Sequence, residues 1–493
     1  MTTPLVTVIT PVHDTRPYLE PWFDSLREQT LDPGELEVLA VDDASTDGSR
    51  EELHRLAASW PEVVRVVPLE QRGGPGRARN EGLRRARGRH LFFLDSDDRL
   101  GPEALRRMTL TAERCGSDVV VGRVAGVNGR WVPAFACRET DDDVRFPGGD
   151  LAWTLTPSKL FRTELVHRHG MRFREDLPAY SDGPFVLEAF FRARRISVLA
   201  DYDYYHLVAR DDRSNITYRS RPADRLRGIA AGIEVTVRFA APGAIRDEVN
   251  DRHLRGDLVN LFRADFLALA RPEQEALVAS AAELVRAHLT DPIRARCSEA
   301  QRLRLHCLQH GLVGELTDLV RHETETGGLP EPMSASVSWS PQGLRVRTSR
   351  PLPQLTSAPV TWVRGQGRDG QGGRRGGGRG GRGSRGGQVR AGDETARVAT
   401  DDETVIPLTS LLPHQRVALR VESSLAGREV TAALTPEAGL GQRRVWHGGR
   451  LYRVTPMPGP RGELVVWVAV IRPGRVLKLR LRQLSRRHRA VRA

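Results

Sequence analysis

The chain has 493 residues, which is too long for one ordinary domain and predicts two or three. Its four cysteines show neither C-x-x-C spacing nor a paired histidine signature, which argues against a disulfide framework or a zinc finger. No signal peptide is evident before the first predicted strand, and no run approaches the roughly 20 apolar residues of a membrane span. We therefore expect a cytoplasmic protein with reduced thiols, whose only membrane contact is peripheral, at the inner face.

The net charge of +13 is concentrated in two segments. Residues 364–392 contain eight arginines and one aspartate, and residues 472–493 contain nine basic residues and no acid, so the rest of the chain is slightly acidic. Only Lys159 and Lys478 are lysines, a bias typical of a high-GC bacterial genome. The basic tail either holds a phosphate polymer or anionic lipid or is a solubilising terminus.

Apolar periodicity over the first 121 residues predicts strands that alternate with helices. The predicted strands are 5–9, 36–41, 63–67, 90–94 and 118–121. The predicted helices are 18–29, 47–60, one opened near Arg79 by the Gly-rich turn RGGPGRARNEG, and one from Pro102. This alternation predicts an α/β layer fold with a mostly parallel sheet.

Two aspartate clusters follow two of these strands. Asp42 and Asp43 close LEVLAVDD, and Asp95, Asp97 and Asp98 follow RHLFFL. Because the carboxyl ends of parallel strands share one edge of a sheet, both clusters should face one crevice. Carboxylates gathered there need a cation or a hydrogen-bonding ligand, and Asp-x-Asp suits Mg²⁺ or Mn²⁺. The sequence therefore predicts a site for a metal-bound nucleotide.

Four blocks in this order, VTVITPVHDTRPYLEPWFDSLREQT, VDDASTDGS, GPGRARNEGLRRARG and FLDSDD, resemble the family 2 glycosyltransferases of GT-A fold. The resemblance implies a Rossmann-like catalytic domain that uses a UDP-sugar. It also implies that Thr10 and Pro11 line the nucleotide pocket and that Asp43 bonds the uracil ring. Asp95 and Asp97 would hold the Mn²⁺ or Mg²⁺ that bridges the donor diphosphate.

Three more residues are expected near the nucleotide from the same resemblance. They are Ser96, inside the Asp-x-Asp motif, and Arg79 and Asn80 in GPGRARNEG. Arg79 and Asn80 are equally well explained as the ordinary start of an exposed helix.

The segment RFREDLPAYSDGPFVLEAFFRA resembles the block in which this family keeps its catalytic base. The usual acidic pair is replaced here by Ser181 and Asp182. An inverting transferase needs one carboxylate to take the proton of the acceptor hydroxyl during a single displacement. Asp182 is therefore the expected base, with Glu175 and Asp176 as alternatives.

Two further groups of residues are candidates for substrate contacts. In SVLADYDYYHLVARDDRSNITY, which resembles another family segment, Arg210, Arg213 and Ser214 are expected to approach the diphosphate or an anionic acceptor, a task suited to the planar guanidinium. Trp131 and Trp153 either stack on a sugar ring or belong to the core.

The rest of the sequence predicts further domains. Residues 1–220 are assigned to the GT-A catalytic domain, 221–328 to a helical linker domain, and 329–480 to an immunoglobulin-like β-sandwich with a disordered Arg/Gly-rich loop at 364–392; residues 481–493 form a basic tail. This layout resembles bacterial glycosyltransferases that decorate wall teichoic acid. The resemblance implies a polyol-phosphate acceptor and a homotrimer assembled through the C-terminal domain.

The predicted function is an inverting, metal-dependent hexosyltransferase. It would move GlcNAc or another hexose from a UDP-sugar to a hydroxyl of a teichoic acid or related surface glycan; the alternative acceptor is a capsular polysaccharide or a lipid-linked glycan. A sugar nucleotidyltransferase is disfavoured because its Gly-rich turn should directly follow the first strand. RNA binding by the Arg/Gly-rich segment is disfavoured because the segment lacks interleaved aromatics, so no nucleic acid partner is expected.

Overall fold

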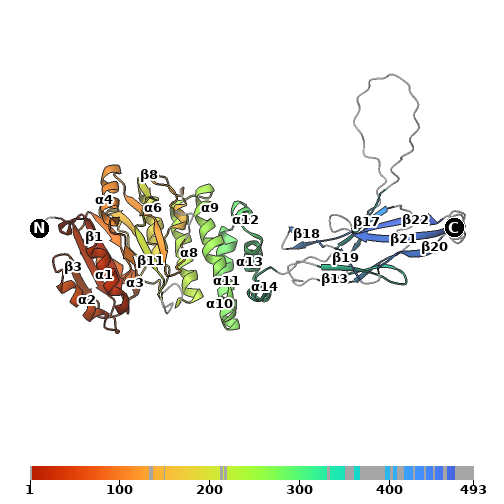
Figure 1. Cartoon of the computed structure of the whole chain (residues 1–493), viewed down its shortest axis with the longest axis horizontal. Helices are drawn as coiled ribbons and strands as arrows, with labels where there is room; N and C mark the ends of the chain where they lie inside the picture. The colour runs from red at the N-terminus through yellow and green to blue at the C-terminus, as the bar shows by residue number, and fades with distance from the viewer. Residues whose placement is uncertain are drawn as a thin grey trace, which may run out of the picture. The chain divides into compact units, whose positions relative to one another are not determined.

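The structure is a computed structural model that describes two compact units, Met1–Val320 and Arg321–Ala493 (Figure 1). The described residues are 3–132, 137–148, 150–210, 215, 219–329, 334–349, 360–366, 395–399, 403–407, 416–425, 428–432, 434–437, 440–447, 450–458 and 464–471. Arg213, Ser214, the basic tail 481–493 and nearly all of segment 364–392 therefore lie outside the described residues.

An eight-stranded sheet forms the centre of the first unit, in the order β3-β2-β1-β4-β9-β6-β10-β8. Its strands are β1 (Val6–Val12), β2 (Leu36–Asp42), β3 (Val64–Pro68), β4 (His90–Phe93), β6 (Val119–Gly122), β8 (Asp141–Val144), β9 (Lys159–Arg162) and β10 (Ile196–Leu199). β1 pairs in parallel with β2 and β4, β2 with β3, and β6 with β10. β9 runs antiparallel to β4 and β6, and β8 antiparallel to β10. The aspartates that follow β2 and β4 thus meet at one edge of the sheet, as predicted.

A smaller sheet carries part of the same edge. It has the order β5-β11-β7, with β5 at Arg99–Leu100, β11 at Tyr205–Val208 and β7 at Val124–Val127. β11 is parallel to β7 and antiparallel to β5. Because β5 begins directly after Asp98, this sheet fixes the backbone that follows the second aspartate cluster.

Helices cover both faces of the large sheet. Successive side chains of a strand point to opposite faces; accordingly Val8 of β1 belongs to one core cluster with α1 (Leu19–Arg27), α2 (Ser49–Ala58) and α4 (Ala104–Cys115). Ile9 belongs to the other, with α3 (Gly74–Arg85), α5 (Thr163–Arg168) and α6 (Asp182–Arg192). Short 3₁₀ helices lie at Arg16–Tyr18 (η1), Pro33–Glu35 (η2) and Leu151–Trp153 (η3).

Helix α3 corrects one expectation. It begins at Gly74, not near Arg79, so most of RGGPGRARNEG is helix and not turn. Pro75 suits the first helical turn because the missing N–H has no partner to lose there. The glycines serve close packing: a Cβ on Gly76 would lie 2.8 Å from the Arg174 carbonyl, and one on Gly82 would lie 2.3 Å from Ile9 Cγ2.

Replacing Gly82 with alanine is expected to lower the free energy of unfolding by roughly 1–3 kcal/mol, because Ile9 is fully buried and cannot move aside. Thermal or urea unfolding of the full chain measures this change. Gly314→Ala is the matched control, since nothing lies within 4 Å of a Cβ placed on Gly314 in α14 (Val313–Thr326). Equal effects of the two substitutions would contradict the close contact of α3 with β1.

Residues 222–326 are helical, as predicted. The helices are α8 (Pro222–Phe239), α9 (Ala244–Asp251), the π-helix η4 (Arg252–Leu258), α10 (Ala264–Leu267), α11 (Arg271–His288), α12 (Asp291–Arg296), α13 (Glu299–His310) and α14. Apolar side chains at helical spacing, including Leu254, Leu258 and Phe262, are fully buried. Among the described residues, no helix is both long and apolar enough to cross a bilayer.

The described residues of the second unit form two sheets. One has the order β16-β13-β12-β19 and the other β15-β14-β17-β22-β21-β20, with β18 paired to β17. The strands are β12 (Ser334–Trp339), β13 (Gly343–Ser349), β14 (Val360–Gln366), β15 (Thr395–Ala399), β16 (Glu403–Pro407), β17 (Arg416–Leu425), β18 (Arg428–Ala432), β19 (Leu434–Pro436), β20 (Arg443–His447), β21 (Arg450–Pro458) and β22 (Leu464–Ile471). Val337 and Val346 of one sheet share a core with Leu419 and Val466 of the other. The predicted fold class, an α/β domain with a helical segment and a β-sandwich, is thus confirmed.

Candidate active site

A cavity of ≈ 490 Å³ opens at the carboxyl edge of the large sheet. The loops after β1, β2 and β4, the start of α3, the turn after β7, and the segments before β9 and α6 all contribute to its wall. The predicted site residues on this wall are Pro11, Asp43, Arg79, Asp95, Ser96, Asp97, Asp182 and Arg210. Segments that are far apart in the sequence thus converge on one cavity.

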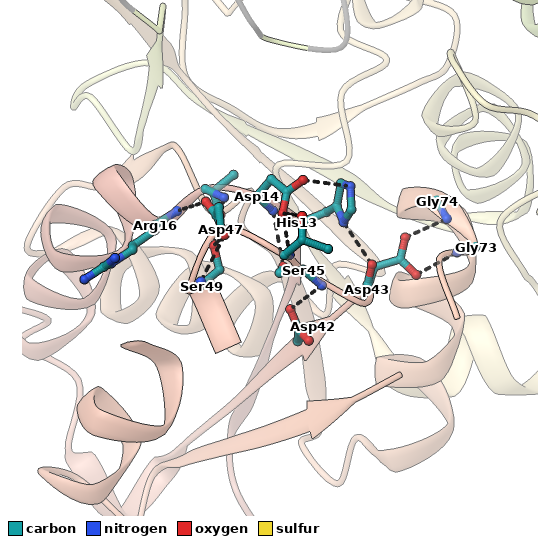
Figure 2. Close-up of polar contacts among 12 residues, drawn as sticks. His13, Asp14, Arg16, Asp42, Asp43, Ser45, Asp47, Ser49, Gly73 and Gly74 are labelled. Carbon is teal, nitrogen blue, oxygen red and sulfur yellow. Dashed lines mark hydrogen bonds and ion pairs between the residues drawn. The ribbon is translucent and has the colours of Figure 1, made fainter. Parts of the chain in front are cut away.

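Asp43 is held rigidly at the rim of the cavity. Its two carboxylate oxygens accept hydrogen bonds from the backbone N–H groups of Gly73 (2.8 Å) and Gly74 (2.7 Å), and the ring Nδ1 of His13 donates to its carbonyl (2.9 Å) (Figure 2). Each carboxylate oxygen can accept more than one hydrogen bond. Asp43 can therefore still accept an N–H from a bound base.

The loops after β1 and β2 are tied together beside Asp43. Asp47 accepts hydrogen bonds from the backbone N–H groups of Ser49, the first residue of α2, and Arg16 (Figure 2). Asp14 accepts one from the N–H of Thr46 (2.8 Å). Asp47, which the sequence suggested as the cap of this helix, lies one residue before the actual N-cap, Gly48, and holds the N–H of Ser49 from outside the helix.

Two of the predicted nucleotide contacts lie behind the wall. Thr10 is fully buried, and its Oγ1 accepts a hydrogen bond from Trp22 Nε1 (3.2 Å). Asn80 is also buried, and its amide donates to the Phe173 carbonyl and to Glu175. Neither side chain lines the cavity, so any influence of these two residues on a ligand would pass through their neighbours.

The Asp-x-Asp carboxylates are each paired with an arginine. Asp95 Oδ1 accepts a hydrogen bond from Arg79 Nη2 (2.8 Å), and Asp97 Oδ2 accepts from Arg210 Nε (2.7 Å) and Asn215 Nδ2 (2.9 Å). Burial raises the pKa of Asp97 above its usual range, although Arg210 opposes this shift. Each carboxylate of the Asp-x-Asp motif is thus paired with a guanidinium group, and Arg79 is shared with Asp182.

Asp98 also lines the cavity, but both of its carboxylate oxygens accept hydrogen bonds from within the protein. Its two oxygens accept hydrogen bonds from the Tyr205 hydroxyl (2.6 Å) and the Val208 N–H (2.8 Å). Burial, and then the charges of Asp97 and Asp95, raise its pKa well above the usual range. Asp98 therefore connects the second aspartate cluster to β11.

The donor set at this edge fits a hard divalent cation. Hydrogen bonds from described residues to Asp95 and Asp97 side chains occupy one oxygen of each carboxylate, and carboxylate oxygens suit Mg²⁺ or Mn²⁺. In the described part of the chain, no three His, Cys, Asp or Glu side chains form a complete metal cage. A cation held by Asp95 and Asp97 would therefore complete its coordination with ligand oxygens and water.

Asp182, the first residue of α6, lies on the same wall and is joined to Asp95 by one side chain. Arg79 Nη1 donates to Asp182 Oδ1 (2.5 Å), while its Nη2 donates to Asp95. Burial raises the pKa of Asp182; Arg79 and Lys159 oppose the shift and Asp95 adds to it. Such a carboxylate is a stronger base than an ordinary surface aspartate.

The two alternative bases are placed differently. Glu175 accepts a hydrogen bond from Asn80, and Asp176 forms an exposed ion pair with Arg174. Neither lines the cavity. The arrangement favours Asp182 as the residue that meets an acceptor hydroxyl.

The helical segment completes the cavity wall, which the sequence did not predict. Gly228, Ile229 and Gly232 of α8 and Arg252, His253 and Asp257 of η4 line it. Arg252 donates to Asp257 (3.2 Å), and Nδ1 of buried His253 lies 3.5 Å from Asp257 Oδ2, while its Nε2 makes no hydrogen bond in the described part of the chain. No local signal marks these residues, because the surrounding helical stretch also carries charged side chains such as Arg246, Asp247 and Glu248.

The two tryptophans of the cavity differ in exposure. Trp131 is 76% exposed and follows a turn after β7 that Arg130 closes by donating its N–H to the Val127 carbonyl (3.1 Å). Trp153 is half-buried, with Arg255 over its ring. The structure thus excludes a core role for Trp131 and leaves its indole available to a ligand.

Trp131→Ala is expected to raise the KM for a sugar substrate by roughly 2- to 10-fold, because aromatic contacts of this kind contribute about 0.5–1.5 kcal/mol. The free energy of unfolding should change by no more than about 0.5 kcal/mol, as for other exposed positions. Leu110→Ala, which also removes an exposed apolar side chain but lies on α4, is the control. Unchanged kinetics with every donor and acceptor would contradict a role in binding.

Comparisons with known proteins agree with this geometry. The model of the glycosyl transferase family 2 matches residues 7–169. This region is a family 2 glycosyltransferase domain. A second model, the glycosyl transferase TarS linker domain, matches residues 222–320. The cavity of the glycosyltransferase domain is thus closed partly by residues of a TarS-type linker.

Two curated relatives cover the glycosyltransferase domain. The poly(ribitol-phosphate) β-glucosyltransferase of Bacillus spizizenii is 36% identical over 206 residues, which are 42% of this chain and 32% of that protein. The poly(ribitol-phosphate) β-N-acetylglucosaminyltransferase TarS of Staphylococcus aureus is 35% identical over 205 residues, 41% of this chain and 35% of TarS. The aligned part of the chain therefore spans about a third of the length of each relative.

A crystal structure of S. aureus TarS residues 1–349 in complex with UDP-GlcNAc is also similar. It superposes with a TM-score of 0.57 and 27% identity and covers 69% of this chain and 96% of that one. The similarity thus extends beyond the glycosyltransferase domain.

Proposed function

We propose that the protein is an inverting, metal-dependent hexosyltransferase that moves a sugar from a UDP-sugar to a hydroxyl of a polyol-phosphate polymer of the teichoic acid type. The observation that carries this proposal is the position of Arg79, whose guanidinium bonds both Asp95 of the Asp-x-Asp motif and Asp182. Only the side chain of Arg79 therefore separates Asp95, where the diphosphate would bind, from Asp182, the proposed base.

The donor end combines a nucleotide contact with a charge-neutralising site. Asp43 would accept an N–H of the uracil ring, and Asp95 and Asp97 would hold Mg²⁺ or Mn²⁺ against the diphosphate. When bound, the cation neutralises charge on the departing nucleotide. Arg210 and Asn215 orient Asp97 for this role, and Arg79 orients Asp95. The contacts proposed for Pro11, Ser96, Arg213 and Ser214 follow from the family resemblance.

The acceptor end supplies the base for a single displacement. Asp182 would take the proton of the attacking hydroxyl while that oxygen bonds to the anomeric carbon and the UDP oxygen leaves. One catalytic carboxylate suffices for this inverting route. Cations on the wall, Arg72, Arg130, Arg210 and Arg252, suit the diphosphate and an acceptor that carries phosphodiesters.

The proposed acceptor class rests on the two poly(ribitol-phosphate) relatives and on the TarS-type linker. The resemblance in domain layout further supports a homotrimer formed through the second unit. The cytoplasmic location at the inner membrane face remains the expectation drawn from the sequence. Light scattering of the full chain, with and without residues 329–493, tests the assembly.

The decisive experiment measures UDP release from a panel of UDP-sugars, with Mn²⁺ or EDTA, and with or without polyribitol- or polyglycerol-phosphate. Metal-dependent release from one donor that the polymer stimulates would support donor, metal and acceptor class together. If a capsular polysaccharide or a lipid-linked glycan stimulates UDP release and the polyol-phosphate polymer does not, that glycan would replace the polymer as the proposed acceptor. No release from any donor would contradict the proposed activity.

A further inference from the structure

Two buried glycines lie one turn apart in the middle of α8, the first helix of the linker. They are Gly228 and Gly232. Glycine inside a helix lowers stability relative to alanine, so its presence there calls for a packing or functional reason. Gly232 makes room for the ring of His253 in η4, because an added Cβ would lie 2.7 Å from the ring Cε1. Gly228 faces a different neighbour.

Gly228 admits the backbone that leads into α6, the helix beside α8 (Figure 1). A Cβ on Gly228 would lie 2.3 Å from Tyr180 Cβ and 2.9 Å from the Ala179 carbonyl oxygen, closer than real side chains approach. Only Ser181 separates Tyr180 from Asp182, the first residue of α6. A side chain at position 228 would therefore push against the backbone two residues before the proposed base.

The bend at Tyr180 depends on this packing. Tyr180 has a φ of 59°, a left-handed conformation that residues other than glycine rarely adopt and that persists only where the surroundings enforce it. In the part of the chain that the structure describes, no backbone hydrogen bond reaches residues 178–180. Contact with α8 is therefore what holds the bend at Tyr180 in place.

The glycosyltransferase domain holds the other end of the same segment. Asn80 of α3 donates to the Phe173 carbonyl (2.9 Å) and accepts from the Phe173 N–H (2.9 Å). Its neighbour Arg79 donates to the Asp182 carboxylate (2.5 Å). The segment from Phe173 to Asp182 is thus fixed by α3 at its start and by α8 just before its end.

We propose that Gly228 is a positioning residue for the transfer reaction: because it lacks a side chain, α8 can hold the bend at Tyr180 and thereby place the carboxylate of Asp182. This inference rests on the proposed function of Asp182 as the base. A base must lie within hydrogen-bond reach of the hydroxyl whose proton it takes, so a small displacement is costly. Through Gly228 the linker contributes to catalysis without supplying a reacting group.

Gly228→Ala tests this role. The variant is expected to lower kcat by roughly 10- to 100-fold, because the new methyl group displaces the bend at Tyr180. The Kd for UDP-sugar, measured by calorimetric titration, should stay within about twofold of the wild-type value, because the proposed donor contacts lie on other elements. Gly314→Ala is the matched control, since it adds a methyl group to another linker helix with nothing within 4 Å. An unchanged kcat in Gly228→Ala would overturn the proposal.

A second substitution shows whether the effect passes through the bend. Tyr180→Gly removes the atom nearest to the new methyl group and suits a φ of 59°. In this background, Gly228→Ala is expected to lower kcat by no more than about threefold, because the effects of residues in contact are not additive. The comparison also decides the case in which Gly228→Ala alone does not fold. A double variant that loses about tenfold or more relative to Tyr180→Gly, or that itself does not fold, would contradict the proposed role.

Hydrogen exchange provides a readout that does not need activity. In Gly228→Ala, a peptide covering residues 177–190 should exchange faster than in the wild type, whereas peptides from β1 and β2 should not change. Gly314→Ala should leave all of these peptides unchanged. A lower kcat without faster exchange in residues 177–190 would place the effect elsewhere and reject the positioning role.

The two proposals fail separately. If the wild type transfers no sugar in any assay while Gly228→Ala still speeds exchange in residues 177–190, the proposed function fails and the contact with α8 stands. If the wild type transfers sugar but neither kcat nor exchange responds to Gly228→Ala, the function stands and the role of Gly228 is lost.

Discussion

Replacing Asp182 with asparagine is expected to lower kcat by roughly 10²–10⁴-fold while UDP-sugar still binds. Asparagine keeps an oxygen that can accept the hydrogen bond of Arg79, but it cannot take a proton from the acceptor. Steady-state UDP release and calorimetric titration with UDP-sugar separate the two effects. In the wild type, the acid limb of the rate profile should lie above the usual aspartate range, because burial raises the pKa of Asp182.

Two further variants show whether the loss is specific to Asp182. Asp176→Asn removes an exposed carboxylate near Asp182 in the sequence, and Glu175→Gln removes one that bonds Asn80. Both should keep wild-type turnover. If Asp182→Asn kept full activity while Asp176→Asn or Glu175→Gln lost turnover, the residue replaced in the inactive variant would be the base.

Replacing Asp97 with alanine is expected to abolish the metal-dependent part of UDP binding. Removing even a partner of a metal ligand commonly weakens metal affinity 10- to 100-fold, so loss of a ligand itself should cost at least ~100-fold. Arg210 and Asn215 would also lose their shared acceptor, Asp97 Oδ2. Titration of UDP in the presence of Mn²⁺ or EDTA measures the effect.

Asp203→Ala is the matched control for that experiment. Asp203 pairs with Arg123 and does not line the cavity, so its removal should leave both titrations unchanged. If Asp97→Ala bound UDP and Mn²⁺ as the wild type does, the assignment of the metal to the Asp-x-Asp motif would be wrong.

The pattern of apolar residues and turns in the sequence was sufficient to predict the central sheet of the catalytic unit. The strands that precede Asp43 and Asp95 are short apolar runs with clear turns, and their parallel pairing with β1 places both clusters at one edge. The start of α3 was misplaced because Gly and Pro usually signal turns, whereas here Gly76 and Gly82 permit close packing. The helix propensities of glycine and proline alone cannot reveal this close packing, because it involves residues that are distant in the sequence.

The parts of the site that sequence reasoning missed come from distant segments. His13 and Asn215 contact Asp43 and Asp97, but each would pass as an ordinary loop residue. Arg252 and His253 belong to a helical run whose packing against the catalytic cavity has no local signature. Strand β9 was also missed, because TPSKLFRTELV carries weak alternation and a lysine where a buried strand favours apolar residues.

The shared wall of the cavity has a consequence for engineering. Because α8 and η4 contribute to the same cavity as Asp43 and Asp182, a fragment cut near residue 220 would lack one side of its own binding site. Chimeras that exchange acceptor preference between related enzymes therefore need to carry Met1–Val320 as a single cassette, with the junction placed where the first compact unit ends.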